Sequence, residues 1–429
     1  MFKTFANAWR IPELRKKILF TLLIVAIFRF GSVVLTVPFV DVAQLRLLFD
    51  AYTQSGNLLG YFNVLTGGAL QNATLFSMSI TPYINASIII QLLTVAIPAL
   101  ERMQKDGGEE GKKKLAAITR YSTVGIGLLQ GFTYYIMLKN QSLLTRTDFW
   151  SACVIILSFT AGASIVMWLG ELITEHGIGN GISDILFVGI VSRIPTMILY
   201  MIQYAKQSAG YLIGMIVLVI VALALVVFIV WVSNAERRIP IQYAKRMVGR
   251  KMYGGQSTNL PMKVNMSGVL PVIFASTLLM FPATIISFLN PAEGSFWLKV
   301  EHFFSPTSWS YVILYTLLIV GFGYFYSLIQ FNPVEVANNL KKNGGFVMGY
   351  RPGKPTSDYL ARILSKITFI GSVFLIIIAL LPVILGIVTD INGITIGGTS
   401  LLIVVGVALE IYQQLEAQIM MRHYKGFLE

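Results

Sequence analysis

The sequence predicts an all-α polytopic membrane protein, one that crosses the lipid bilayer many times. Of its 429 residues, 55% are hydrophobic and only 12% are charged, and the mean hydropathy is +0.71. Soluble domains carry about twice that share of charged residues, so these charges are too few to solvate a globular chain of this size. Runs of about 20 mostly apolar residues, long enough to cross a bilayer as a helix, recur along the chain. The basic residues gather in alternate segments between these runs.

The apolar runs give ten candidate membrane spans. They lie at residues 18–38, 76–97, 116–138, 152–172, 182–202, 212–232, 269–289, 309–329, 367–387 and 398–415. When residues near a span's end are counted with the adjoining segment, 26 of the 33 Lys and Arg residues fall in alternate segments that start with the N-terminus. Six fall in the other segments, and Arg29 lies inside the first span. Because basic residues concentrate in cytoplasmic loops, we predict ten spans with both termini in the cytoplasm. The net charge of +13 is then expected to reflect topology rather than nucleic-acid binding.

The first span and the segment after it carry two unusual features. Arg29, in FRFG, lies near the middle of the span, where it is either a structural charge satisfied by its neighbours or a functional one. The external stretch 58–76 is too apolar for a water-exposed loop and too short and glycine-broken to span. We expect a short re-entrant helix followed by Gly67 and Gly68, because irregular backbone at membrane depth needs protein or a cavity around it. The alternative is an interfacial helix on the outer leaflet.

The second span is half polar. Its polar residues are Thr81, Asn85, Ser87, Gln91 and Thr94. On a helix of 3.6 residues per turn, Gln91 shares a face with Ile80 and Ile84, with Asn85 beside it. Burying an amide in hydrocarbon without a partner costs several kcal/mol, so this face is expected to meet protein or water. Either it lines a path through the protein, or its small polar residues pack inside a helix bundle.

The link between the fourth and fifth spans has three glycines within residues 177–181 and no basic residue, which predicts a tight reversal of the chain. Asp184 follows as an acid just inside the fifth span. It is either an ion or proton site or, as we expect, an acid near a helix N-terminus that the helix dipole favours.

A long cytoplasmic segment, 234–268, has the pattern of a β-hairpin. Ile239 and Ile241 alternate with polar residues, and Arg250 and Lys251 then precede a Gly-Gly pair. Strand-like alternation followed by a basic, glycine-rich turn predicts a protruding hairpin with a basic tip.

A second cytoplasmic segment, 330–366, holds Arg351 and other basic residues around Gly and Pro turns. Positive-inside anchoring alone does not require loops of this length. We therefore expect both segments to dock a large anionic partner, such as ribosomal RNA or an acidic motor protein. The alternative is that these charges only set the topology of the chain.

The sequence carries no recognisable catalytic motif. It has no HExxH, no GxSxG, no Walker lysine and no Cys/His metal cluster; its single cysteine is Cys153, and its three histidines lie far apart. A secondary transporter usually places ionisable groups at the membrane midplane, and here only Arg29 and Asp184 qualify. We therefore favour a pore that receives something from the cytoplasm over a transporter or an intramembrane enzyme, and we expect no cofactor.

At the level of individual motifs, the chain resembles the SecY family of protein-conducting channels along essentially its whole length. The matching stretches are FRFG at 28–31, GGAL at 67–70, ITPYINASIIIQLL at 80–93, TRY at 119–121, WLGELITEHGIGNGIS at 168–183, QYAKRMVGRKMYGGQSTNLPMKVN at 242–265, FNPVEVANNLKKNGGFVMGYRPG at 331–353 and GGTSLLIVV at 397–405. Agreement over eight such blocks does not follow from composition.

The resemblance implies a fold of two five-helix halves, residues 1–205 and 206–429, related by a pseudo-two-fold axis in the membrane plane. It implies a short re-entrant plug helix at about 60–72, whose plug residues are Phe62, Asn63, Gly67 and Gly68. It also implies a lateral gate between the second and seventh spans, with gate residues Asn85, Gln91 and Phe281. Polar gate residues would keep the closed seam from becoming an inert apolar interface.

The resemblance further implies a pore ring. Its members are Ile80, Ile84, Ile182, Leu186, Ile273 and Ile403. Branched apolar side chains that converge on a narrow waist exclude water and ions yet deform around a passing chain. Leu186 stands where the family usually has Ile, which should preserve the seal. Asp184 stands where an apolar residue is common, and we expect it to point to the lipid headgroups or a neighbouring helix.

The function implied is a passive channel that translocates unfolded preproteins across the bacterial plasma membrane and releases membrane-protein segments laterally into it. The expected docking contacts for the ribosome or the SecA ATPase are Arg250, Lys251 and Arg351. The other partners implied are SecE, which would clamp the two halves, a peripheral SecG, preproteins bearing signal sequences, and the lipid bilayer.

Overall fold

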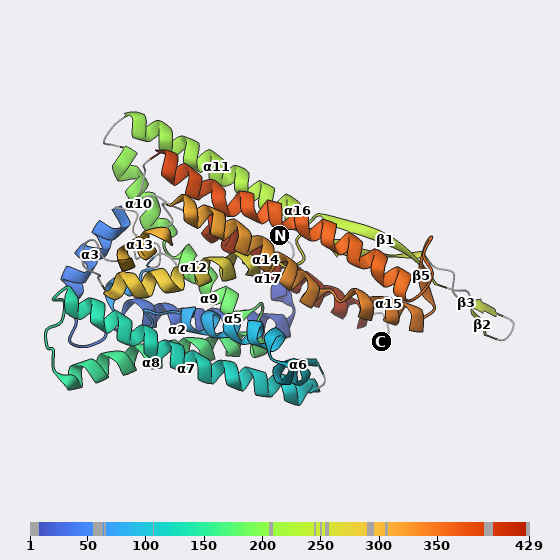
Figure 1. The fold of residues 1–429 in the computed structure, drawn as a ribbon, viewed down its shortest axis with the longest axis horizontal. Helices are drawn as coiled ribbons and strands as arrows, with labels where there is room; N and C mark the ends of the chain where they lie inside the picture. Colours follow the sequence, from blue (N-terminus) through green and yellow to red (C-terminus); the bar gives the residue numbers. More distant parts are fainter. Residues whose placement is uncertain are drawn as a thin grey trace.

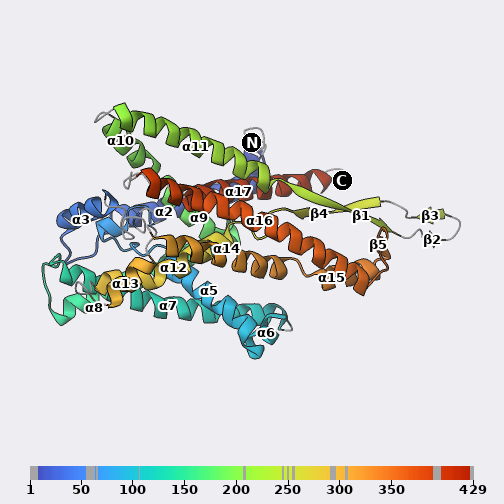
Figure 2. The same ribbon diagram turned by 45° about the horizontal axis from the view of Figure 1, so that its top comes forward.

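Long helices run side by side along the molecule, and a small β-structure projects from one end of the bundle, as the computed structural model shows (Figure 1). The structure describes residues 8–54, 63, 66–105, 107–205, 209–243, 246–248, 251–253, 257–289, 296–304, 308–389 and 398–425. Figure 2 shows α10 and α11 on one side of the bundle and α5, α7 and α8 on the other.

Every predicted span coincides with helix. The helices that match single spans are α2 (Pro12–Val33), α5 (Thr81–Ala96), α7 (Gly108–Asn140), α8 (Phe149–His176), α11 (Ala209–Ser233), α12 (Leu270–Leu289), α14 (Trp309–Gln330), α16 (Lys354–Thr389) and α17 (Gly398–Lys425). Within the described residues, four helices are individually long and apolar enough to cross a membrane, or five if a bent pair, Thr81–Ala96 with Pro98–Gln104, counts as one span. The helical fold is as predicted, and the number of ten spans stays a prediction.

The fifth predicted span is divided into two helices, α9 (Gly181–Val191) and α10 (Ile194–Ala205). The chain turns between them, where the Arg193 N–H donates to the Ile190 carbonyl at 3.0 Å. Pro195 accounts for the break, because it lacks the N–H that would donate to the Val191 carbonyl and its ring would collide with that carbonyl. The span predicted at 182–202 is therefore built from two helices instead of one.

The segment after α2, which we predicted to be external, contains α3 (Val42–Gln54), a helix that the sequence did not suggest to us. The expected re-entrant helix at 60–72 lies largely outside the described residues. Its described part is a turn at 66–69 and the short 3-10 helix η1 (Leu70–Asn72). The Val37 N–H donates to the Ala73 carbonyl at 2.9 Å, so the chain returns to the end of α2 before α5 begins.

The predicted hairpin is confirmed. Strands β1 (Glu236–Tyr243) and β4 (Ser257–Lys263) pair antiparallel, and the short strands β2 (Arg246–Val248) and β3 (Lys251–Tyr253) pair beyond them. A further strand, β5 (Gly345–Val347), adds to the other edge of β1. It comes from the segment 330–366, the second of the two predicted cytoplasmic segments. This segment and the hairpin therefore form one ordered body, whereas the sequence suggested two separate loops.

Short helices complete the chain. They are α6 (Pro98–Lys105), α13 (Phe296–Phe303) and α15 (Pro333–Lys342). The start of α15 is fixed by its own sequence, since the Asn332 side chain accepts hydrogen bonds from the N–H groups of Val334 and Glu335. Pro333 occupies the first helical position, where no N–H is needed.

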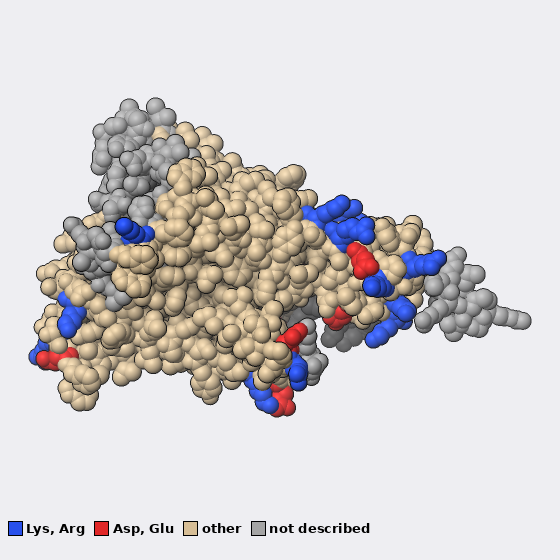
Figure 3. Space-filling view, viewed as in Figure 1, with Lys and Arg blue, Asp and Glu red and all other residues tan. Residues whose placement is uncertain are grey.

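The surface separates into charged ends and an uncharged middle. Figure 3 shows Lys, Arg, Asp and Glu side chains at the two ends of the face in view, with a broad belt free of charged side chains between them. Within the belt, α11 exposes Leu223, Val227 and Trp231, which are 62%, 69% and 72% exposed. Their spacing of four residues places them on one helix face. Such an apolar outer surface is suited to lipid and not to water.

Candidate channel site

The six residues of the expected pore ring come together in one buried cluster of apolar side chains. Five of them are 0–8% exposed, and Ile182 is partly buried against the same cluster. They come from four helices: Ile80 and Ile84 from the start of α5, Ile182 and Leu186 from α9, Ile273 from α12, and Ile403 from α17. We call this set of six the waist.

Local structure explains how two helices present paired waist residues. Ile80 and Ile84, like Ile182 and Leu186, are four residues apart and therefore lie on one helix face. The Asn180 side chain caps α9 by accepting a hydrogen bond from the Ile182 N–H at 3.2 Å. Gly181 sits against the Gly170 carbonyl of α8, where a side chain would collide. This contact allows α9 to start directly beside α8, as the glycine-rich link predicted.

The gate residues lie on two helices that pack together, α5 and α12. Asn85 is buried and Gln91 is partly buried on α5, while Phe281 is partly buried on α12 beside Pro282. The polar face of α5 therefore meets protein, as expected from its composition.

Gln91 is held by partners on two helices. Its side-chain N–H donates to Ser87 Oγ at 3.3 Å, and its carbonyl accepts a hydrogen bond from the Tyr326 hydroxyl of α14. The Tyr326 ring also meets Phe274 of α12 edge to face, with centroids 5.1 Å apart. Tyr326 thus links α5, α12 and α14. We missed it from sequence, although a hydroxyl within an apolar span is a signal that a polar partner lies nearby.

The plug residues are partly described. Phe62 lies outside the described residues, whereas Asn63 is buried and both glycines are described. The Gly68 N–H donates to the Asn63 carbonyl at 2.8 Å. Arg29 of α2 donates to the Gly67 carbonyl at 3.3 Å, which gives this intramembrane arginine a partner.

Asp184 lies in the first turn of α9, as expected for an acid near a helix N-terminus, and it is 3% exposed. Its carboxylate lies against the link between α8 and α9, where a Cβ atom at Gly179 would be 2.7 Å from Oδ2. Neither of its carboxylate oxygens has a hydrogen-bond partner among the described residues.

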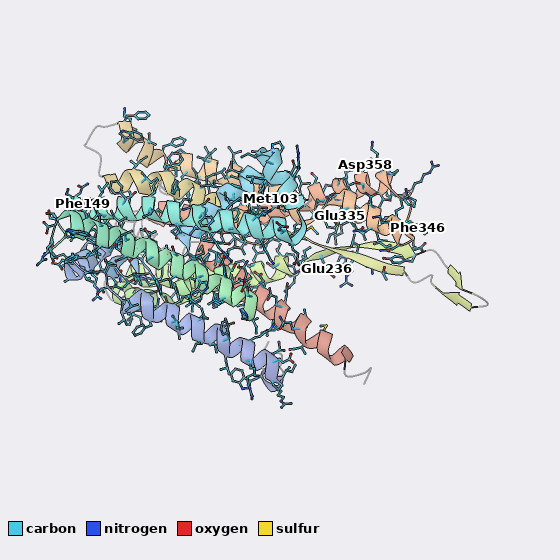
Figure 4. All side chains as sticks on the ribbon, turned by 90° about the horizontal axis from the view of Figure 1, so that it is seen from below. Met103, Phe149, Glu236, Glu335, Phe346 and Asp358 are labelled. Atoms are coloured by element: carbon cyan, nitrogen blue, oxygen red, sulfur yellow. The ribbon has the colours of Figure 1, made fainter. Side chains whose placement is uncertain are left out.

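Arg351, one of the three expected docking residues, lies at the same end of the molecule as the β-structure. In Figure 4, Glu335, Phe346 and Asp358 mark this end, and Phe149 lies at the opposite one. Arg351 is exposed, on a turn held by a hydrogen bond of 2.7 Å from the Thr356 hydroxyl to the Arg351 carbonyl. Arg250 lies outside the described residues, and only the backbone of Lys251, at the start of β3, is described.

Comparison with known proteins gives consistent matches. A family model described as SecY matches residues 74–412. The chain is 43% identical over 441 residues to the protein translocase subunit SecY of Streptomyces coelicolor, with 100% of both chains covered. It superposes with a TM-score of 0.64 and 17% identity on a SecY channel whose plug domain is described as stabilising the closed state, covering 94% of this chain and 92% of that one. It matches Sec61 of a canine ribosome-channel complex from the endoplasmic reticulum with a TM-score of 0.61 and 16% identity, over 94% and 92%.

Proposed function

The chain belongs to the SecY family, and from this premise we propose that its waist is the constriction of a protein-conducting channel. The function of the chain is protein translocation through a membrane. The family assignment rests on both the matched family model and full-length relatives, so it covers all the elements described above.

The observation that carries the proposal is the convergence of the six waist residues from four helices in one buried apolar cluster. An ion that entered such a constriction would lose its hydration shell and gain no ligand, so the closed waist opposes ion flow. An unfolded polypeptide differs, because its apolar and backbone surface displaces water while the branched side chains rearrange around it.

The arrangement of helices supports a channel between two halves, residues 1–205 and 206–429. The waist takes α5 and α9 from the first half and α12 and α17 from the second. Parting α5 from α12 would open the side of the channel to lipid, which is the route we propose for signal sequences and for membrane-protein segments.

The β-structure and α15 supply the docking platform in this proposal. Its apolar core joins Ile239 and Ile241 of β1 to Leu340 of α15 and to Leu360 and Ile363 of α16. A platform with its own core can transmit force from a bound partner to the membrane helices. We propose that a ribosome or the SecA ATPase binds here and that SecE and SecG complete the translocase. The bilayer would be the bacterial plasma membrane, with both termini in the cytoplasm.

Site-specific crosslinking to a protein in transit tests the channel. A preprotein is arrested by a tightly folded C-terminal domain and carries one cysteine in the arrested stretch. In a Cys153→Ala background, Leu186→Cys is expected to form a disulfide with the cysteine of the arrested preprotein. Ile155→Cys is the control, because Ile155 is fully buried in an apolar core separate from the one that holds the waist. Efficient export without a crosslink from any of the six waist positions would contradict the proposal.

A further inference from the structure

Two arginines, one in a helix and one in a turn between helices, hold the described part of the expected plug. We define this part, Asn63 and residues 66–72, as the plug segment. Arg29 of α2 donates from Nη1 to the Gly67 carbonyl at 3.3 Å. Arg193, in the turn between α9 and α10, donates from Nη2 to Gln71 Oε1 at 2.9 Å. The segment is thus held at two points along its length, one in the turn at 66–69 and the other in η1.

The backbone of the plug segment approaches Arg193 unusually closely. A Cβ atom at Gly68 would lie 2.6 Å from Arg193 Cζ, and Gly68 has a φ of +83°. Only glycine satisfies both conditions without strain. The guanidinium therefore contacts the backbone itself as well as a side chain, and any displacement of the segment must break this contact.

Gln71 connects the Arg193 contact to the rest of the segment. Its side-chain oxygen also accepts from Asn63 Nδ2 at 2.7 Å, and its N–H donates to Asn63 Oδ1 at 3.1 Å. Both lone pairs of the Gln71 oxygen are used, one by Arg193 and one by Asn63. Losing the arginine would leave this partly buried oxygen with one of its two hydrogen bonds, so the closed position depends on Arg193 through Gln71.

The chemistry of the acceptors makes this grip reversible. Residues 55–75 contain no Asp, Glu, Lys, Arg or His, and both arginines donate to amide oxygens, which are neutral. Bonds from charged donors to neutral acceptors are stronger than neutral hydrogen bonds. Release of the segment nevertheless leaves no carboxylate stranded at membrane depth, which breaking an ion pair would do.

We propose that Arg193 and Arg29 are positioning residues that seat the plug segment in the closed channel and so set how readily it opens. The effect of these contacts on translocation rests on the proposed function. The contacts themselves are present in the resting chain and can be tested without any substrate.

The test measures exposure of Ala69, a fully buried residue of the plug segment. Ala69→Cys in a Cys153→Ala background is labelled with a membrane-impermeant maleimide in the purified chain, with no preprotein present. Arg193→Ala and Arg193→Gln are each expected to raise the labelling rate roughly tenfold, the effect of losing one hydrogen bond from a charged donor. Arg193→Lys keeps a donor and should restore part of the protection. Arg146→Ala is the matched control, because Arg146 is exposed and lies over the Phe39 ring.

Gln71→Ala keeps the inference falsifiable if an arginine variant does not fold. It removes the acceptor of the Arg193 bond, together with the Asn63 bond to the same oxygen. Its effect and that of Arg193→Ala should add up to less than their sum, because both variants lose the Arg193–Gln71 bond. Unchanged labelling in folded Arg193→Ala or Gln71→Ala, or an equal rise in Arg146→Ala, would contradict the positioning role of Arg193. Failure of the unsubstituted chain to translocate any preprotein would contradict the proposed function. The labelling result would still decide whether the arginines position the plug segment.

Discussion

Asp184 is a buried carboxylate in the first turn of α9. Both of its oxygens lack hydrogen-bond partners among the described residues. An unpaired buried polar group costs about 1–3 kcal/mol, and a charged one costs more. We predict that Asp184→Asn, which keeps the volume and removes the charge, raises the thermal unfolding temperature of the detergent-solubilised chain. Asp358→Asn, at an exposed site, should change nothing. A less stable Asp184→Asn chain would show that an unseen partner satisfies the carboxylate.

Arg351 is an exposed residue whose role is expected to be electrostatic. Reversing a charge on a surface turn changes docking and removes no buried packing. We predict that Arg351→Glu blocks ATP-driven translocation into vesicles and leaves the unfolding temperature unchanged. Arg362→Glu is the control, since Arg362 is also exposed but lies about two turns into α16, closer to the membrane belt. Normal translocation by Arg351→Glu would show that Arg351 does not take part in docking.

Among helices, the contact between α5 and α14 is the polar link whose loss should affect the gate most directly. Tyr326→Phe removes the hydroxyl that binds Gln91 and keeps the ring packed on Phe274. Hydrogen bonds between membrane helices average about 0.6 kcal/mol, so a small effect is expected. We predict faster hydrogen exchange across residues 81–96 in mass spectrometry. Tyr324→Phe, which removes a bond to the Ser365 carbonyl, should not alter that segment. Equal exchange in both variants would mean that Tyr326 does not restrain α5.

Elements that repeat a simple pattern could be predicted, and elements that depend on distant partners could not. The spans follow from apolar length, and the β1–β4 hairpin follows from the alternation of Ile239 and Ile241. Strand β5 was missed because three residues, Gly345–Val347, form a strand only when the edge of β1 is present. The break at Ser192 was signalled by Pro195, but the apolar run across it concealed the signal.

Over the whole molecule, the distribution of charge gives a test of orientation. The charged platform and the sparsely charged outer end lie on opposite sides of the uncharged belt (Figure 3). We predict that Asp358→Cys, in a Cys153→Ala background, is labelled by an impermeant maleimide only after cells are opened. Thr147→Cys, between α7 and α8, should be labelled on whole cells. Labelling of Asp358→Cys from outside would show that the chain has the opposite orientation to the predicted one.

The candidate site could be assembled from sequence only through the family resemblance. Composition alone placed Ile80, Ile182 and Ile403 in apolar spans but gave no reason to bring them together. Their convergence depends on how four helices pack, which neither periodicity nor motif spacing encodes. The contacts that hold the plug segment could not be predicted for the same reason, because Arg193 and Gln71 are 122 residues apart in the chain.

The central claim is that the waist seals the resting channel against ions, and electrical recording in planar bilayers tests it most directly. Single substitutions can be masked, because the remaining side chains close around a small gap. We predict that a triple variant, Ile84→Ser with Leu186→Ser and Ile273→Ser, raises the resting conductance, since a polar constriction no longer dewets. Ile319→Ser is the control, because Ile319 is buried in the same cluster on α14 but outside the waist. A folded triple variant with the resting conductance of the unsubstituted chain would contradict the account.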